Sequence, residues 1–136
     1  MTFEYQSKIY LGEVALYVAD LARQNAFYQR VLGLELLEEQ DGQVALGRDG
    51  QALVKLLATS DRQSVKSDYG LYHLALLLPS RQALADILKH LSENKVPMVG
   101  GADHGYSEAI YLEDPEGNSI ELYRDKPQAD WDIRED

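Results

Sequence analysis

A carboxylate stands in the middle of an apolar strand near the end of this 136-residue chain. Glu121 lies between Ile120 and Leu122, in a segment that alternates as a β-strand does. Burying a carboxylate in such a strand is costly unless a cation accompanies it. Glu121 therefore indicates one of three partners, which are a metal ion, a lysine or a substrate.

The residues before Glu121 predict a hairpin that carries further ionisable groups. His104 opens the segment, and Tyr111, Glu113 and Glu121 all stand at odd positions of the two expected strands. The turn at 114–118 supplies a proline, which fixes φ, and a glycine, which tolerates positive φ. Ionisable residues thus occupy positions where apolar residues would pack more easily.

Two copies of one structural unit account for most of the chain, at about residues 8–58 and 70–124. The residue pattern of each copy predicts a strand, a helix and three further strands. Asp20 and Ser80 are the expected N-caps of the two helices. The predicted helices and strands are a helix at 21–31 with strands at 11–18, 34–40, 43–48 and 51–58, then a helix between Ser80 and Asn94 with strands at 72–78, 98–100, 108–112 and 119–123.

This order predicts an α+β fold in which two βαβββ modules form one half-open mixed β-barrel, with the helices outside and a cleft inside. We expect a single domain over residues 1–124, with a polar linker between the modules at 59–69. Residues 125–136 read as an acidic C-terminal tail. The cleft is the expected position for a small-molecule ligand.

The composition limits the classes of function. The formal net charge is −10, from 23 acidic and 13 basic residues, and this balance argues against nucleic acid as a partner. The chain has no cysteine, which excludes disulfides, zinc-thiolate sites and thiol nucleophiles. No apolar run is long enough to span a bilayer, so we expect no membrane partner and a cytoplasmic location.

Two stretches, one near each end of the repeat, carry a family resemblance. The residues concerned are Val14–Leu21, Phe27-Tyr28 and Leu32-Gly33-Leu34 in the first stretch, and Asp114–Asn118 with Ile120–Tyr123 in the second. They resemble the vicinal-oxygen-chelate superfamily, which includes glyoxalase I, bleomycin-resistance proteins and extradiol dioxygenases. The resemblance extends from about Tyr10 to Tyr123 and implies the paired-module fold.

Within that superfamily the chain is most similar to extradiol enzymes of the catechol 2,3-dioxygenase type. Gly70–Pro79 and Asp103–Tyr123 resemble the N-terminal half of two-domain members from Gram-positive bacteria. Those proteins continue into a second domain that normally holds the metal site, whereas this sequence stops at Asp136. The resemblance leaves two interpretations open: a free-standing relative, expected to be a homodimer, or an N-terminal half whose C-terminal domain is missing.

The resemblance also implies a metal site built from the first and last strands of each module. His73 and Glu121 match the ligand types of the family, and Glu13 stands where a histidine is usual. Lys55 corresponds in the repeat to Glu121 and stands where glyoxalase I has a glutamate ligand. Glu13, His73 and Glu121 would form a facial ligand set for Fe(II), Mn(II), Ni(II) or Zn(II).

Lys55 supports a different interpretation of the same residues. Its ammonium group could neutralise Glu13 or Glu121 without any metal, because two unit charges about 4 Å apart attract by about 4 kcal/mol at an effective dielectric constant of about 20. The same charge is an obstacle to a dication. Metal binding and metal-free neutralisation both stay open at this point.

His104 and Tyr111 are the candidate catalytic residues that the resemblance implies. In extradiol enzymes a histidine and a tyrosine beside the metal handle the protons of substrate and oxygen, and the run from His104 to Ala109 followed by Tyr111 resembles that pattern. The alternatives are that His104 caps backbone groups in a loop, and that Tyr111 only lines the cleft.

Two functions therefore compete. The first is a divalent-metal-dependent enzyme that chelates neighbouring oxygens of a small substrate, with extradiol catechol dioxygenase chemistry as its most specific form. The second is a metal-free small-molecule binding module of the resistance type, or a non-catalytic N-terminal half of a two-domain dioxygenase.

Overall fold

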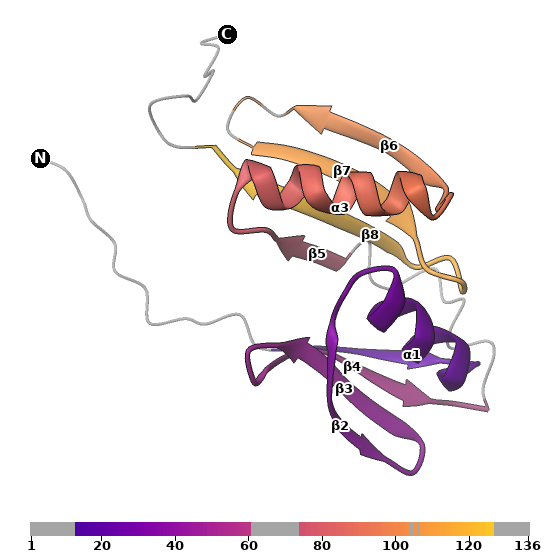
Figure 1. Ribbon diagram of the computed structural model, residues 1–136. Helices are drawn as coiled ribbons and strands as arrows, with labels where there is room; N and C mark the ends of the chain where they lie inside the picture. Colours follow the sequence, from indigo (N-terminus) through magenta and orange to yellow (C-terminus); the bar gives the residue numbers. More distant parts are fainter. Residues whose placement is uncertain (1–12, 61–73, 104, 106, 127–136) are drawn as a thin grey trace, which may run out of the picture.

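The computed structural model describes residues 13–60, 74–103, 105 and 107–126, and it contains two βαβββ modules (Figure 1). The predicted α+β fold is thus confirmed. The first module consists of β1 (Val14–Val18), α1 (Leu21–Arg30), β2 (Glu35–Gln40), β3 (Gln43–Arg48) and β4 (Gln51–Ala58). The second consists of β5 (Leu74–Leu77), α3 (Arg81–Glu93), β6 (Met98–Asp103), β7 (Ser107–Glu113) and β8 (Ser119–Asp125).

Both helices begin at the residues that the sequence predicted. The Asp20 carboxylate accepts a hydrogen bond from the backbone N–H of Arg23 at 3.1 Å, and the Ser80 hydroxyl accepts one from the backbone N–H of Ala83 at 3.1 Å. Each cap satisfies a donor that the first turn of a helix leaves unpaired. Gly33 follows the end of α1 with φ of 72°, which a glycine adopts without steric cost.

The strands form two four-stranded mixed sheets, in the orders β1-β4-β3-β2 and β5-β8-β7-β6. In each sheet the first strand of the module is parallel to the last, and the other neighbours are antiparallel. Among the described residues no strand pairing joins the two sheets, so the barrel is not closed. β6 extends to Asp103, beyond the predicted end at 100, because Gly101 and Ala102 pair with Ile110 and Ala109 of β7.

One hydrophobic core lies on the helix side of both sheets. Both helices stand on the same side of the sheets (Figure 1), and buried residues of the two modules form a single cluster. The cluster takes alternate strand residues, such as Val54 and Leu56 of β4 and Ile120 and Leu122 of β8. The residues between them lie on the opposite sheet face, which we call the open face.

Asp114, at the start of the turn between β7 and β8, joins the second module to the first. Its side chain is only 4% exposed and accepts hydrogen bonds from Gln24 Nε2 and Tyr28 Oη of α1, both at 2.8 Å. Asn118 and the backbone N–H of Glu116 donate to the same carboxylate from within the turn. The turn that the sequence predicts at 114–118 therefore also forms a contact between the two modules.

The neighbouring residue Glu116 adds a second link between the modules. Its carboxylate accepts hydrogen bonds from the backbone N–H groups of Ala19 at 2.7 Å and Asp20 at 3.0 Å. These amides lie just before α1, where the helix dipole favours a negative charge. We refer to Asp114, Glu116, Gln24 and Tyr28 as the latch.

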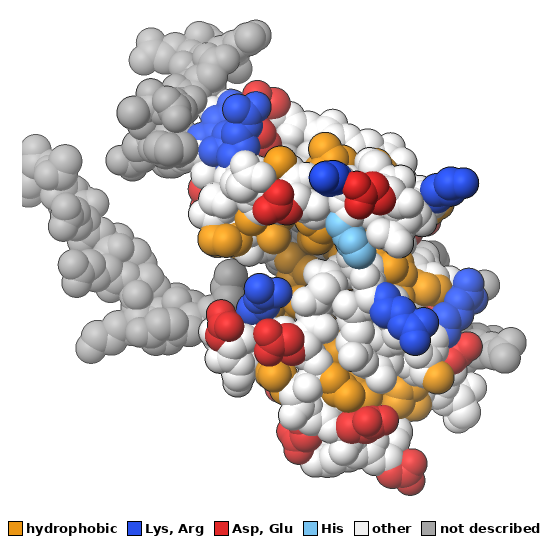
Figure 2. All heavy atoms as spheres, viewed as in Figure 1, with side chains coloured by type: hydrophobic (Ala, Val, Ile, Leu, Met, Phe, Trp, Pro, Cys, Tyr) orange, Lys and Arg blue, Asp and Glu red, His pale blue; other side chains and the backbone are white. Residues whose placement is uncertain are grey.

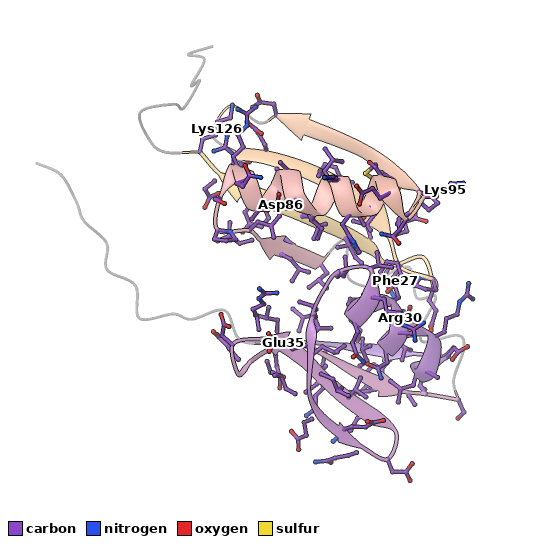
Figure 3. All side chains as sticks on the ribbon, in the orientation of Figure 1. Phe27, Arg30, Glu35, Asp86, Lys95 and Lys126 are labelled. Atoms are coloured by element: carbon purple, nitrogen blue, oxygen red, sulfur yellow. The ribbon has the colours of Figure 1, made fainter. Side chains whose placement is uncertain are left out.

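The two helices also meet. His90 of α3, an exposed residue, places Nε2 2.9 Å from the carbonyl oxygen of Arg30 at the end of α1. Figure 3 labels Phe27 and Arg30 where α1 approaches the second module, and hydrophobic side chains show in the furrow between the modules in Figure 2. None of the helices in the described part of the chain is long and apolar enough to cross a membrane.

Candidate functional site

Lys55 and Glu121 occupy equivalent positions in the two sheets. Lys55 of β4 pairs with Ala15 on the parallel strand β1 and with Ala45 on the antiparallel strand β3. Glu121 of β8 pairs in the same way with Ala75 on β5 and Tyr111 on β7. The observed register therefore agrees with the correspondence of Lys55 and Glu121 that the sequence repeat predicted.

Both side chains lie on the open face. Their strand neighbours Val54, Leu56, Ile120 and Leu122 are buried in the core, so alternation turns Lys55 and Glu121 away from the helices. Both residues are half-buried. A half-buried charge in the centre of a sheet is poorly hydrated, and its interaction with an opposite charge is stronger than it would be in open solvent.

The Tyr111 hydroxyl orients the Glu121 carboxylate. Tyr111 Oη donates a hydrogen bond to Glu121 Oε1 at 3.2 Å, across a directly paired position of β7 and β8. The hydrogen bond limits the rotation of the carboxylate. The structure thus brings together Tyr111 and Glu121, two of the residues that the sequence singled out.

Glu13 comes next to the first strand of the first module. It is exposed, directly precedes β1 and stands two residues before Ala15, the strand partner of Lys55. His73 and His104, the other two predicted site residues, lie outside the described residues. Within the described residues there is no cluster of three histidine, aspartate or glutamate side chains able to hold a metal ion.

Lys55 makes no salt bridge with Glu13 or Glu121 in the part of the chain that the structure describes. The salt bridges present there join other residues, such as Arg124 with Glu108 at 2.8 Å and Lys126 with Asp103 at 2.8 Å. The direct neutralising contact that the sequence left open is therefore not formed among these residues. Lys55 instead lies between two alanines on the open face.

Two pairs of apolar side chains border these charged positions, and sequence reasoning missed them. Two residues further along each strand, Tyr17 pairs with Leu57 and Leu77 pairs with Tyr123, on the same sheet face. Tyr17 is 62% exposed near the end of β1, and Leu77 is 56% exposed at the end of β5, so both leave large apolar side chains uncovered. The sequence did contain a signal for their place, because their odd positions match those of Lys55 and Glu121 and put them on the same sheet face.

The environment of Tyr123 supports a partly desolvated open face. Burial raises the pKa of its hydroxyl above the ordinary value, and the negative charges of Asp125 and Glu121 raise it further. The tyrosine therefore stays protonated and can act as a hydrogen-bond donor throughout the neutral range.

A cavity on the other side of the first sheet has a different lining. A cavity of about 510 Å³ opens on the helix side of the first module, between α1 and the strands β2 and β3. Asn25, Gln29 and Arg30 line it from α1, and Glu39 and Gln40 line it from β2. None of the predicted site residues borders this cavity.

Comparison with known proteins identifies the family. The model of the Glyoxalase/Bleomycin resistance protein/Dioxygenase superfamily matches residues 10–122. A catechol-2,3-dioxygenase of Bacillus subtilis is 38% identical in an alignment of 125 positions, which covers 90% of this chain but only 44% of the relative. The chain thus spans less than half the length of that relative. A lactoylglutathione lyase of Neisseria meningitidis is 28% identical over 85% of this chain and 90% of its own length.

Solved structures support the same fold. A lactoylglutathione lyase from Agrobacterium tumefaciens superposes with a TM-score of 0.70 at 22% identity and covers 88% of this chain and 96% of its own. A glyoxylase/bleomycin resistance protein/dioxygenase domain from Frankia superposes with a TM-score of 0.73 at 16% identity, over 88% of this chain and all of its own. At these identities the likeness concerns the fold alone. Together with the family model and the dioxygenase relative, it means that this chain belongs to the glyoxalase/bleomycin resistance protein/dioxygenase superfamily.

Proposed function

We propose that this chain is a divalent-metal-dependent enzyme that chelates two neighbouring oxygens of a small substrate at the open face. The observation that carries the proposal is Glu121, a half-buried carboxylate in an apolar strand, held by the Tyr111 hydroxyl at 3.2 Å. Extradiol cleavage of a catechol is the most specific form of the proposal. The 38% identity with a catechol-2,3-dioxygenase supports that form.

Glu13, His73 and Glu121 are the residues proposed to hold the metal. Two carboxylates and one imidazole suit Fe(II), Mn(II), Ni(II) or Zn(II). The half-buried position of Glu121 on the open face supports its proposed role as a ligand. A bound divalent metal would supply a Lewis acid and a template for two substrate oxygens. Tyr111 positions the carboxylate, and His104 is proposed to handle substrate protons.

A metal-free binding module, or a non-catalytic half of a longer protein, is the second candidate. Lys55 favours it, because a lysine occupies the position equivalent to Glu121 and repels a dication. The coverage of only 44% of the dioxygenase relative also favours a half.

Metal binding distinguishes the two candidates. We expect the protein, purified without chelator and loaded anaerobically with Fe(II) or Mn(II), to bind close to one metal ion per chain, as measured by elemental analysis after desalting. Glu121→Gln should lower the metal affinity by at least about tenfold, because it removes a charged ligand. Glu113→Gln is the matched control, because Glu113 is an exposed glutamate at the end of β7. Metal far below stoichiometric amounts in the wild type would rule out the enzyme.

We also propose that the protein acts in the cytoplasm, as a homodimer or together with a second domain. Two modules of this family pair within one chain here, and a second pair would give the molecule a size near that of the dioxygenase relative. Sedimentation velocity of the 15.3 kDa chain measures this directly. A single species at the monomer mass over the micromolar range would contradict the homodimer.

A further inference from the structure

Lys55 is a cation in the centre of a sheet with no acidic partner among the described residues. Its side chain is half-buried, and it forms none of the salt bridges that the described part of the chain contains. Partial burial of an unpaired charge costs free energy.

Small side chains flank Lys55 on both neighbouring strands, namely Ala15 and Ala45. Beyond Ala45, Glu38 of β2 lies in the same row of the sheet and lines the same small hollow, but it forms no salt bridge with Lys55. At the equivalent position of the second sheet, Tyr111 reaches Glu121 and holds it. The two sheets therefore present one cationic and one anionic group at corresponding places.

Apolar surface lies beside both charges. Tyr17 and Leu57 come next to Lys55 along their strands, and Leu77 and Tyr123 come next to Glu121. Tyr17 and Leu77 remain largely exposed, at 62% and 56%. Exposed large apolar residues beside a poorly hydrated charge are the setting in which amphipathic small molecules bind.

We propose that the open face binds a small organic monoanion, with a carboxylate on Lys55 and an apolar, ring-sized body against Tyr17 and Leu57, the pair that follows Lys55 on the same sheet face. This inference rests on the proposed function in taking the open face as the ligand cleft, and it adds the substrate class. A single ammonium group matches a single negative charge. A dianion such as a phosphate ester would leave a charge unpaired on a protein whose net charge is −10.

Ligand titrations in the presence of EDTA test this inference apart from any metal. Phenylacetate is the probe, phenylacetamide is its uncharged counterpart, and phenyl phosphate is the dianion. Binding is followed by two-dimensional NMR of the full chain. We expect phenylacetate to bind at least about tenfold more tightly than phenylacetamide, since charge pairs at partly desolvated positions are worth more than 1.4 kcal/mol.

Four variants assign the effect to the proposed residues. Lys55→Gln should remove the preference for phenylacetate over phenylacetamide, and Lys55→Arg should keep it. Leu57→Ala should weaken both ligands by a similar factor, because it removes apolar contact only. Lys89→Gln is the matched control, since Lys89 is a surface lysine with a side chain that is 76% exposed. Retained thermal unfolding transitions verify that each variant is folded.

The outcomes separate this inference from the proposed function. Equal binding of the three ligands by the wild type, no binding at millimolar concentrations, or a preference that survives Lys55→Gln would overturn the inference. Tighter binding of phenyl phosphate would replace the monoanion with a dianion and overturn the stated class. Selective phenylacetate binding in EDTA, by a protein that also takes up no Fe(II) or Mn(II) in the separate loading experiment, would support the inference and refute only the metal-dependent enzyme.

Discussion

At the residue scale, the two sheets carry opposite charges at one shared position. Lys55 and Glu121 have equivalent strand partners but differ in what holds them, because Tyr111 donates to Glu121 whereas two alanines flank Lys55. The difference is chemical rather than geometric, since the backbone register is the same. Single substitutions at these positions therefore change the ligand preference without moving the strands.

Lys55→Glu should convert the cationic position into a further carboxylate ligand. When the first and last strands of both modules face one site, the variant supplies one more oxygen donor and loses a charge that repels the metal. Its affinity for Mn(II) should therefore rise by at least about tenfold. Isothermal titration calorimetry of wild type and variant measures the change. Lys55→Gln is the control for loss of charge alone. An unchanged affinity in Lys55→Glu would mean that Lys55 and Glu121 do not share a site.

Tyr111→Phe should reduce metal affinity by about tenfold, because the hydroxyl that orients Glu121 is a partner of a ligand rather than a ligand itself. The same calorimetric titration measures it. The fold should be unaffected, since the phenyl ring is retained. A variant that binds metal like the wild type would show that Glu121 needs no orientation by Tyr111.

At the element scale, the turn between β7 and β8 does more than reverse the chain. The Asp114 carboxylate gathers donors from its own turn and from α1, and Glu116 caps the approach to α1. A buried carboxylate with this many donors is stabilising only while the donors stay in place. This turn thus adds a specific polar contact between the modules to their shared core and to the contact of His90 with Arg30.

Asp114→Ala should lower the free energy of unfolding by about 3 kcal/mol or more, because Gln24 and Tyr28 would be left with buried donors and no acceptor. Urea unfolding followed by circular dichroism measures the loss. Glu113→Ala, one residue earlier and exposed, is the control and should change the stability by less than about 0.5 kcal/mol. A comparable loss in both variants would contradict a specific role of the latch.

Short sequence patterns predicted the helices and strands well, but they did not predict contacts between residues that are far apart in the sequence. Asp20 and Ser80 start the helices as expected because a cap acts over three residues. Asp114 was recognised only as turn chemistry, since its partners Gln24 and Tyr28 are 90 and 86 residues away. The equivalence of Lys55 and Glu121 followed from the repeat. The apolar residues Tyr17 and Leu77 were missed because exposure is a property of the folded sheet.

At the scale of the whole molecule, one buried tyrosine links stability to pH. Burial raises the pKa of Tyr28 far above its ordinary value, and the charge of Asp114 and its hydrogen bond raise it further. In the unfolded chain the same hydroxyl ionises near pH 10. A pKa that is higher in the folded state gives a contribution to stability that is complete below about pH 10 and declines above it.

Alkaline unfolding of Tyr28→Phe tests this linkage. At pH 8 the variant should be about 2 kcal/mol less stable than the wild type, because it loses a hydrogen bond to a charged acceptor. Above pH 10 the difference should shrink by about 1.4 kcal/mol per pH unit, since only the wild type gains from ionisation on unfolding. Urea unfolding at pH 8, 10 and 11 measures the difference. A constant difference would contradict a raised pKa for Tyr28.

The two modules contribute different residues to the latch, as a comparison of the two helices shows. The residues of α3 that correspond to Gln24 and Tyr28, four and eight positions after the N-cap, are Leu84 and Leu88. The turn between β3 and β4 has only Asp49-Gly50 at its tip, where the later turn has residues 114–118. The repeated halves have therefore become complementary rather than interchangeable. Two first halves have no Asp114, and two second halves have no Gln24 or Tyr28, so a mixture of separately produced halves should sort itself into unlike pairs.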